Sequence, residues 1–318
     1  MSEVPVFGGR PGAESTIVIT DSGLGGLSIC ALLEQGLRVA DPSRNVRLTY
    51  VNAWPFEDRG YNDLPDEAAR ARVFDGVLVR IAEMLPDRIL IACNTLSILY
   101  PRTAFSRRPP VTVQGIVDAG VDLFAERLAG DPASSIVLVG TRTTIESGVH
   151  KARLEQRGIA SRRIAAVSCH GLAGAIERDV DGPRTAELAA ACMGRAAEAA
   201  PPGGTVLLGL CCTHYGYVAV RLTDLVARQT SRPVLALDPN RQLTSCLLAD
   251  TAFFEDSGGV APPSVAPGAS AAGAVSVELV SKVVLSDLAR TGIARLVAPV
   301  SAATAGALLS YALVPDLF

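Results

Sequence analysis

Short runs rich in Val, Ile and Leu recur along this chain, and helix-like stretches separate most of them. The runs are IVIT (17–20), VRLTYV (46–51), ILIA (89–92), VTV (111–113), IVLVG (136–140), VLLGL (206–210) and VLAL (234–237). Strands that alternate with helices in this way predict α/β architecture with doubly wound parallel sheets. Ligands of such sheets bind beyond the carboxyl ends of the strands, so the residues that follow each run are the candidates for function.

Four of these strand ends are followed by hydroxyl, amide or thiol side chains and then by a helical pattern. Two of the clusters, 20–23 and 93–95, precede position 110, and the other two, 140–144 and 212–214, follow position 136. The arrangement indicates an architectural duplication, with two similar lobes that face each other across a cleft. We predict a discontinuous first lobe and a second lobe within it. The expected ranges are 1–114 and 225–318 for the first lobe and 115–224 for the second.

The C-terminal part of the chain has a different composition and predicts an extension of the first lobe. Residues 257–277 are uncharged and rich in Pro, Gly, Ala and Ser, which is typical of a linker. The segment 276–292 then predicts one more strand or helix. The uncharged run from Leu296 to Pro315 is about long enough for a membrane span, but Pro299 and several small polar residues dilute its apolarity. We therefore favour a packed helix, or a contact in a homodimer, over a membrane span.

Charge and cysteine usage exclude several classes of protein. The net charge is −3 and no Lys/Arg run occurs, so a nucleic-acid partner is not expected. The N-terminal residues lack a secretory signal pattern, which predicts a cytoplasmic protein. The 7 cysteines show neither disulfide-framework nor zinc spacing, so free thiols and no metal site are expected. Lys151 and Lys282 are the only lysines, and neither lies in a candidate loop, which disfavours pyridoxal phosphate.

The glycine-rich loop TDSGLGGLS, residues 20–28, allows three interpretations. A dinucleotide-binding fingerprint would need glycine where Ser28 stands, and the carboxylate of Asp21 would repel a pyrophosphate. Asp21 and Ser22 could instead simply cap the helix that follows. We favour the third interpretation, in which this Asp-Ser pair holds a substrate or takes part in catalysis.

Cys93 and Cys212 each follow a buried strand and begin a helical pattern, a position that favours the thiolate. Acyl transfer by Cys212 with His214 as its base is one alternative, but side chains two residues apart usually diverge, and Cys93 would have no role. Two thiols on opposing lobes suit another reaction, in which one removes a proton from carbon and the other returns a proton to the opposite face. Either cysteine could also be a buried apolar residue. That interpretation is kept for Cys30, Cys169, Cys192, Cys211 and Cys246.

Four motifs together resemble those of a known enzyme family. They are TDSGLGGLS (20–28), IACNTLS (91–97), GTRTTIESG (140–148) and LCCTHYG (210–216). In their order and approximate spacing the chain resembles the cofactor-independent aspartate/glutamate racemase superfamily, and within it the glutamate racemases. The resemblance implies an isomerase that interconverts L- and D-glutamate for cell-wall synthesis. It also implies two α/β lobes, the second inserted into the first, and a small amino-acid substrate without any cofactor.

The resemblance also implies roles for individual residues. Cys93 and Cys212 would be the paired acid and base, assisted by Asp21 and His214 at the thiols, and Glu177 falls where a second assisting carboxylate is expected. The remaining matched residues would bind the substrate. They are Ser22, Pro55, Phe56, Asn94, Thr95, Thr141, Thr144 and Thr213.

Two departures from the family pattern leave the substrate open. Pro55-Phe56-Glu57 stands where glutamate racemases usually have Pro-Tyr-Gly, and a Glu57 carboxylate near the pocket would disfavour an acidic side chain. Gly216 also replaces a usual proline. A racemase of aspartate or of a less acidic amino acid, and a binding protein that has kept the cleft without catalysis, therefore remain as alternatives.

Overall fold

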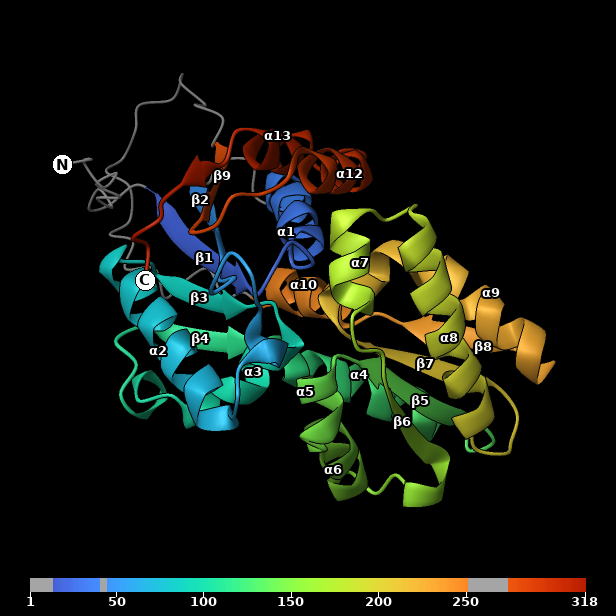
Figure 1. Cartoon of the computed structure of the whole chain (residues 1–318). Coiled ribbons are helices and arrows are strands. Elements are labelled where there is room, and N and C mark those ends of the chain that lie inside the picture. The colour runs from blue at the N-terminus through green and yellow to red at the C-terminus, as the bar shows by residue number, and fades with distance from the viewer. Residues whose placement is uncertain (1–13, 41–44, 251–273) are drawn as a thin grey trace, which may run out of the picture.

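The structure is a computed structural model that describes residues 14–40, 45–250 and 274–318 (Figure 1). Most of the predicted linker, from residue 257 to 273, lies outside the described residues, as do residues 1–13.

Within the described residues, parallel strands form a first sheet of 6 strands in the order β10, β9, β2, β1, β3, β4. The strand bounds are β1 (Ser15–Asp21), β2 (Val46–Asn52), β3 (Arg88–Ile91), β4 (Thr112–Gly115), β9 (Val275–Ser281) and β10 (Ala312–Leu313). Every neighbouring pair in this sheet runs parallel.

The second sheet described has 4 strands in the order β6, β5, β7, β8, and its pairs are also parallel. The bounds are β5 (Ser135–Gly140), β6 (Ile164–Ser168), β7 (Val206–Cys211) and β8 (Val234–Leu237). Two parallel sheets with interleaved helices confirm the predicted fold class, and Figure 1 shows the two sets of strands as separate groups.

Helices cover both faces of each sheet. Their bounds are α1 (Leu27–Ala40), α2 (Glu67–Glu83), α3 (Asn94–Leu99), α4 (Ile116–Gly130), α5 (Arg142–Glu146), α6 (Val149–Gln156), α7 (Leu172–Arg178), α8 (Pro183–Ala199), α9 (Ala219–Thr230), α10 (Pro239–Ala249), α12 (Asp287–Val297) and α13 (Ala302–Leu309). Short 3₁₀ turns lie at Tyr61–Asp63, Tyr100–Arg102, Phe105–Arg107, Ser161–Arg163 and Thr213–Val218.

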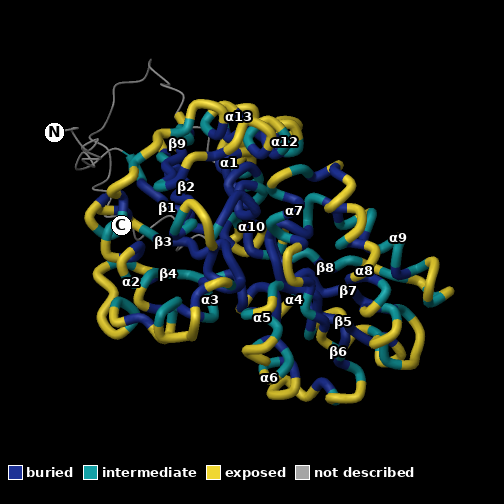
Figure 2. Tube along the Cα trace, in the orientation of Figure 1, coloured by how far each residue is buried: buried dark blue, intermediate teal, exposed yellow. Residues whose placement is uncertain are grey.

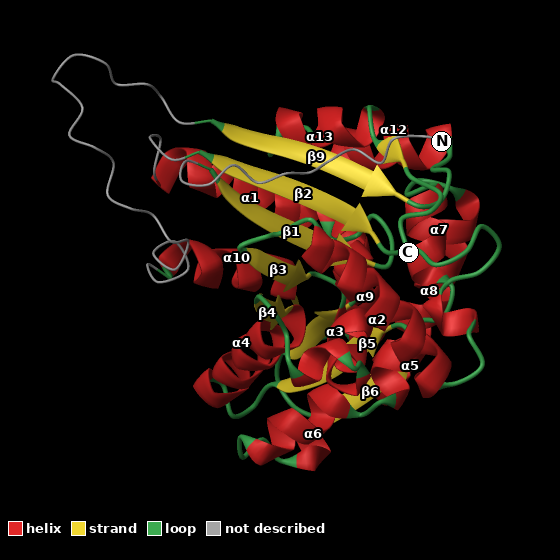
Figure 3. Cartoon of the chain, turned by 90° about the vertical axis from the view of Figure 1, so that its left-hand side faces the viewer, coloured by secondary structure: helices red, strands yellow, loops and turns green. Residues whose placement is uncertain are grey.

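The apolar side chains of the strands alternate between two cores, as the two-residue period of a strand requires. In β5, Ile136 and Leu138 pack with α4 and α6, whereas Val137 and Val139 pack with α7, α8 and α9. The first sheet is divided in the same way, with α1, α10, α12 and α13 over one face and α2 and α3 over the other. Strands buried on both faces explain why their sequences are almost continuously apolar (Figures 2 and 3).

The C-terminal segment completes the first sheet. The predicted strand or helix after the linker is both, because β9 pairs with β2 and α12 follows it. The side chain of Ser286 caps α12 by accepting a hydrogen bond from the amide of Ala289. The apolar run Leu296–Pro315 is divided between the end of α12, the short α13 and β10. Across the described ranges, no helix has the length and apolarity that crossing a bilayer requires.

Strand β8 extends the second sheet past the boundary expected at position 224. It pairs with β7 through Val234–Leu237, and α9 packs on the second sheet before it. The chain therefore returns to the first sheet only at α10, which packs against α1 and α4. An isolated strand pattern does not reveal which sheet the strand joins, so the sequence alone does not assign this strand to a sheet.

Candidate active site

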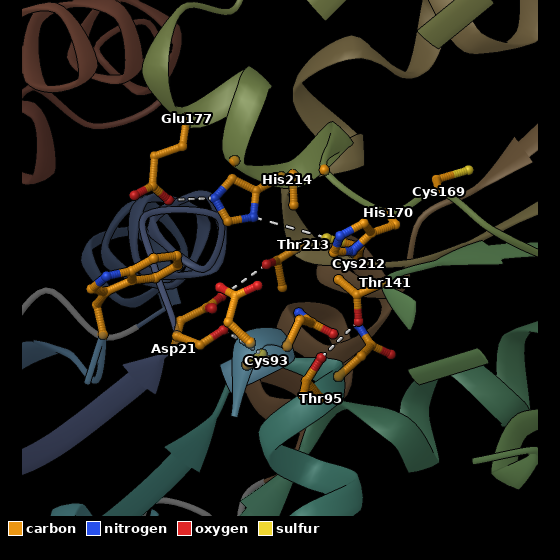
Figure 4. A pocket seen from close by; sticks show the side chains of 18 of the residues that line it. Asp21, Cys93, Thr95, Thr141, Cys169, His170, Glu177, Cys212, Thr213 and His214 are labelled. Carbon is orange, nitrogen blue, oxygen red and sulfur yellow. Dashed lines mark hydrogen bonds and ion pairs between the residues drawn. The ribbon is translucent and has the colours of Figure 1, made fainter. Parts of the chain in front are cut away.

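A cavity of about 290 Å³ lies where loops from the two sheets meet (Figure 4). The loops that follow β1, β3, β5 and β7 all contribute side chains to its lining. Most of the residues predicted for the site line it, namely Asp21, Ser22, Cys93, Asn94, Thr95, Thr141, Glu177, Cys212, Thr213 and His214. Side chains that are far apart in the sequence therefore converge at the carboxyl ends of parallel strands, as this architecture predicts.

Asp21 is the last residue of β1 and is almost completely buried. Its Oδ2 atom accepts a hydrogen bond of 2.8 Å from the Thr213 hydroxyl, whereas Oδ1 has no partner. Burial raises the pKa of Asp21 to about 6, against the opposing effects of His214 and Thr213. A carboxyl group with a pKa near 6 can exchange a proton close to neutral pH.

Cys93 lies in extended conformation directly before α3, so its thiol stands at the start of that helix. The Ser22 hydroxyl lies 3.2 Å from its sulfur atom, and either group can donate the hydrogen bond. Burial, with the negative charge of Asp21, raises the pKa of Cys93. The expectation that the helix would favour the thiolate was therefore wrong here, because desolvation outweighs the effect of a helix of six residues.

Cys212, His214 and Glu177 form a chain of contacts on the second sheet's side of the pocket. The sulfur atom of Cys212 lies 3.9 Å from Nδ1 of His214, and Nε2 of His214 lies 2.6 Å from a carboxylate oxygen of Glu177. Burial alone would lower the pKa of His214. The hydrogen bonds to Cys212 and Glu177, with their negative charges, outweigh burial and hold that pKa well above its ordinary value.

The contact between Cys212 and His214 corrects the expectation that these side chains diverge. Cys212 is in extended conformation, but Thr213 begins a 3₁₀ turn, which curls the chain and returns the imidazole toward the thiol. Glu177 also accepts a hydrogen bond of 2.7 Å from the backbone amide of Leu24, so it links α7 to the loop after β1.

Three threonine hydroxyls from the two sheets form a cluster at another part of the site. The Oγ1 atoms of Thr95, Thr141 and Thr144 lie 3.0 Å from one another. Thr144 is buried behind the other two and does not line the cavity itself. Each hydroxyl can both donate and accept, so the cluster can rearrange to donate hydrogen bonds to a carboxylate.

Pro55 and Phe56, which were expected in the pocket, are not among the residues that line this cavity. The ring of Phe56 lies beneath two cations instead, with the guanidinium of Arg59 at 4.9 Å and the ammonium of Lys282 at 5.8 Å from its centroid. Glu57 also lies outside the lining, where it is exposed and accepts a hydrogen bond from the amide of Val284. The loop turns these side chains toward the C-terminal segment, which a local sequence pattern does not reveal.

Polar and aromatic side chains outside the predicted set also line the cavity, among them Trp54, Asp58, Arg59, Asn62, Asp63, His170 and Arg178. Asn62 accepts a hydrogen bond of 3.1 Å from the amide of Thr143 and so joins the two lobes. Arg59 and Arg178 are exposed at the rim. These residues belong to none of the four motifs, so only their positions in space identify them.

Groups of three or more metal-ligating side chains do not occur in the part of the chain that the structure describes. All 7 cysteines fall within it, and none is in a disulfide.

Comparison with known proteins identifies the family. The sequence profile described as Asp/Glu/Hydantoin racemase matches residues 18–244. Among curated relatives, a glutamate racemase of Corynebacterium glutamicum is 28% identical over 260 residues, which cover 79% of this chain and 85% of that protein. A glutamate racemase of Brucella ovis is 30% identical over 237 residues, which cover 71% of this chain and 76% of that protein.

Solved structures of glutamate racemases share the fold. The Campylobacter jejuni structure aligns with a TM-score of 0.61 at 18% identity, covering 88% of this chain and 98% of that one. The Francisella tularensis structure, solved in complex with D-glutamate, aligns with a TM-score of 0.60 at 16% identity, covering 89% and 93%. The profile spans most of the chain and includes all four motifs, so the chain belongs to the Asp/Glu/Hydantoin racemase family of isomerases.

Proposed function

We propose that this protein is a glutamate racemase that inverts the α-carbon with two thiols. The observation that carries the proposal is that Cys93 and Cys212, from loops of different sheets, line the same cavity. The α-carbon can lose its proton on one face, and the resulting planar carbanion can be reprotonated on the other face, only if base and acid approach from opposite sides.

In the proposed reaction, one cysteine thiolate takes the α-hydrogen as a proton. The Cα–H bond breaks, an S–H bond forms, and the electron pair stays on the substrate. The thiol of the other cysteine then gives its proton to the opposite face of the same carbon and becomes the thiolate. No electron is gained or lost, and the reverse reaction exchanges the roles of Cys93 and Cys212.

The groups beside each thiol suit this proton transfer. The Ser22 hydroxyl hydrogen-bonds the Cys93 thiol, and the nearby Asp21 carboxyl, with a pKa of about 6, can exchange a proton near neutral pH. On the other side, His214 contacts Cys212 and is held by Glu177. The raised pKa of His214 favours an imidazolium that stabilises the Cys212 thiolate.

Three observations favour glutamate over a less acidic substrate. Glu57, the carboxylate that argued against an acidic side chain, lies outside the cavity lining. Arg178 at the rim and the hydroxyls of Thr95 and Thr141 offer positive charge and hydrogen-bond donors to the carboxylates of glutamate. The lining also contains Asp63 and Asp58, and Asp58 pairs with Arg59 at 3.8 Å. The curated relatives are named glutamate racemases. The proposed role is the supply of D-glutamate for the cell wall.

The test is to offer the purified protein single enantiomers of glutamate, aspartate, glutamine and serine in deuterium oxide, with no cofactor added. Loss of optical rotation and of the α-proton NMR signal is expected for glutamate at a higher rate than for the others. Faster racemisation of another amino acid would reject glutamate as the substrate. Exchange without loss of rotation, or no exchange at all, would reject the two-thiol reaction.

A further inference from the structure

His150 is a buried imidazole behind the wall of the cavity. It lies on α6 in the second lobe, is only 3% exposed and is not part of the cavity lining. Its Nε2 atom lies 3.1 Å from Oδ1 of Asn94, which belongs to α3 on the first sheet and follows Cys93 directly. Asn94 is buried as well and does line the cavity.

The chemistry of this contact determines which atom carries the proton. Burial, with the positive charge of Arg153, lowers the pKa of His150 to about 4, so the ring is neutral at neutral pH and carries one N–H. An amide oxygen can only accept a hydrogen bond, so the proton must be on Nε2. The other ring nitrogen, Nδ1, is buried without a partner, which agrees with a bare lone pair there.

The same hydrogen bond leaves the other end of the Asn94 amide with no partner. Its Nδ2 group is buried, and none of the described residues accepts a hydrogen bond from it. Leaving a buried polar group without a hydrogen-bond partner is unfavourable, so a ligand that accepts from it is favoured. Because the oxygen and nitrogen of an amide point in different directions, an oxygen held by His150 leaves the NH₂ group available to a ligand in the cavity.

We propose that His150 is a positioning residue, which holds the Asn94 oxygen so that the Asn94 NH₂ group donates a hydrogen bond to a carboxylate oxygen of the bound amino acid. The inference rests on the proposed function, since it needs an anionic amino acid in the cavity. Without His150 the amide can rotate by half a turn. It would then present its oxygen to the carboxylate, and two acceptors repel each other.

The test compares two substitutions of His150. His150→Leu removes the donor, and we expect the KM for glutamate to rise about 10-fold or more while kcat changes less than about 3-fold. His150→Gln keeps an N–H donor at a similar reach and should stay within about 3-fold of the unchanged protein. Glu155→Gln, an exposed change on the same helix, is the matched control. A KM that is the same for His150→Leu as for Glu155→Gln would overturn the proposal.

A second measurement does not depend on racemisation. NMR of the protein with ¹⁵N-labelled histidine, without substrate at neutral pH, should show His150 as the Nε2–H tautomer. An Nδ1–H tautomer would overturn the proposal, since Asn94 would then donate to the ring and turn its oxygen to the cavity. If the unchanged protein racemises no amino acid, the proposed function fails, while the tautomer still reports on this hydrogen bond. The melting temperature of His150→Leu should stay within a few degrees, because it also removes the unpartnered Nδ1 atom.

Discussion

The hydroxyl of Thr213 donates a hydrogen bond of 2.8 Å to the carboxylate of Asp21, although 192 positions separate the two residues. Asp21 ends a strand of the first sheet, and Thr213 follows a strand of the second. Asn240, at the start of α10, donates to the backbone oxygen of Thr213 and strengthens the same junction. The candidate site is therefore built on the contact between the two lobes, so changes at the junction should affect activity and stability together.

Removal of either thiol should abolish racemisation. We expect Cys93→Ala and Cys212→Ala each to lower kcat at least about 10³-fold, because general acid–base catalysis contributes roughly 10²–10⁴-fold and each direction needs both groups. Loss of optical rotation from L- and D-glutamate measures the effect. Cys246→Ala, at an exposed cysteine, is the control and should keep full activity. Racemisation that survives in either of the first two variants would refute the two-thiol assignment.

Asp21→Asn should change how stability depends on pH. The pKa of Asp21 is raised in the folded protein from 3.8 to about 6, so the native state binds this proton more tightly than the unfolded state does. The contribution of the protonated Asp21 to the free energy of unfolding is therefore complete below pH 3.8 and is lost as the pH rises through about 6. Each pKa unit corresponds to about 1.4 kcal/mol, so the free energy of unfolding should fall by about 3 kcal/mol more in the unchanged protein than in the variant.

Urea denaturation at intervals between pH 4 and pH 7.5 measures this difference. Asp87→Asn, at a carboxylate that accepts a hydrogen bond from the amide of Thr16 and lies outside the cavity, is the comparison variant. If the unchanged protein and Asp21→Asn have parallel pH profiles, the burial of this carboxylate does not raise its pKa.

Glu177→Gln should make the imidazole of His214 harder to protonate, while the amide oxygen of the new side chain can still accept the hydrogen bond from the backbone amide of Leu24. The negative charge and hydrogen bond of Glu177 help to raise the pKa of His214, so the amide should lower that pKa. The alkaline limb of the kcat/KM profile for glutamate should move to lower pH, with a loss of about 10-fold or more at pH 8. Glu198→Gln, an exposed change at the end of α8, should leave the profile unchanged. An unmoved alkaline limb in Glu177→Gln would contradict the proposed role.

Gly25→Ala should disrupt the junction between the lobes. A Cβ atom at position 25 would lie 2.2 Å from the Thr213 hydroxyl and 2.7 Å from the backbone nitrogen of His214, closer than atoms can approach. We expect loss of most activity and a lower melting temperature. Gly76→Ala is the matched control, because nothing lies within 4 Å of its added Cβ and it occupies an exposed helical position. The free energy of unfolding of Gly76→Ala should rise by about 0.5–1 kcal/mol. If Gly25→Ala and the unchanged protein have equal melting temperatures, the loop accommodates the added methyl group.

Glu57→Gly should leave substrate preference unchanged, since this carboxylate lies outside the cavity lining. Arg178→Gln, by contrast, removes a rim charge and should raise the KM for glutamate up to about fivefold, in line with roughly 0.2–1 kcal/mol for an exposed ion pair. The ratio of kcat/KM for glutamate and glutamine measures both effects. If Glu57→Gly shifts the substrate preference toward glutamate, Glu57 acts on the substrate in the pocket.

Much of the fold and the site could be predicted from the sequence. Alternating apolar runs predicted two parallel sheets, and the polar residues after four of those runs predicted which loops form the cavity. The predictions failed where local pattern and packing differ. Desolvation in the closed site raises the pKa of Cys93 against the effect of its helix, and a 3₁₀ turn brings His214 back to Cys212. The roles of these residues, the limits of the two lobes and a homodimer remain predictions.

The sequence by itself determined the alternation of strand and helix and the motifs at the strand ends, since periodicity and local propensity belong to consecutive residues. Only the tertiary structure decided that β8 joins the second sheet, that Phe56 and Glu57 turn away from the cavity, and that His150 holds Asn94. Those outcomes depend on burial and on contacts across the two lobes. Such contacts arise between residues that are distant in sequence, so no local pattern records them.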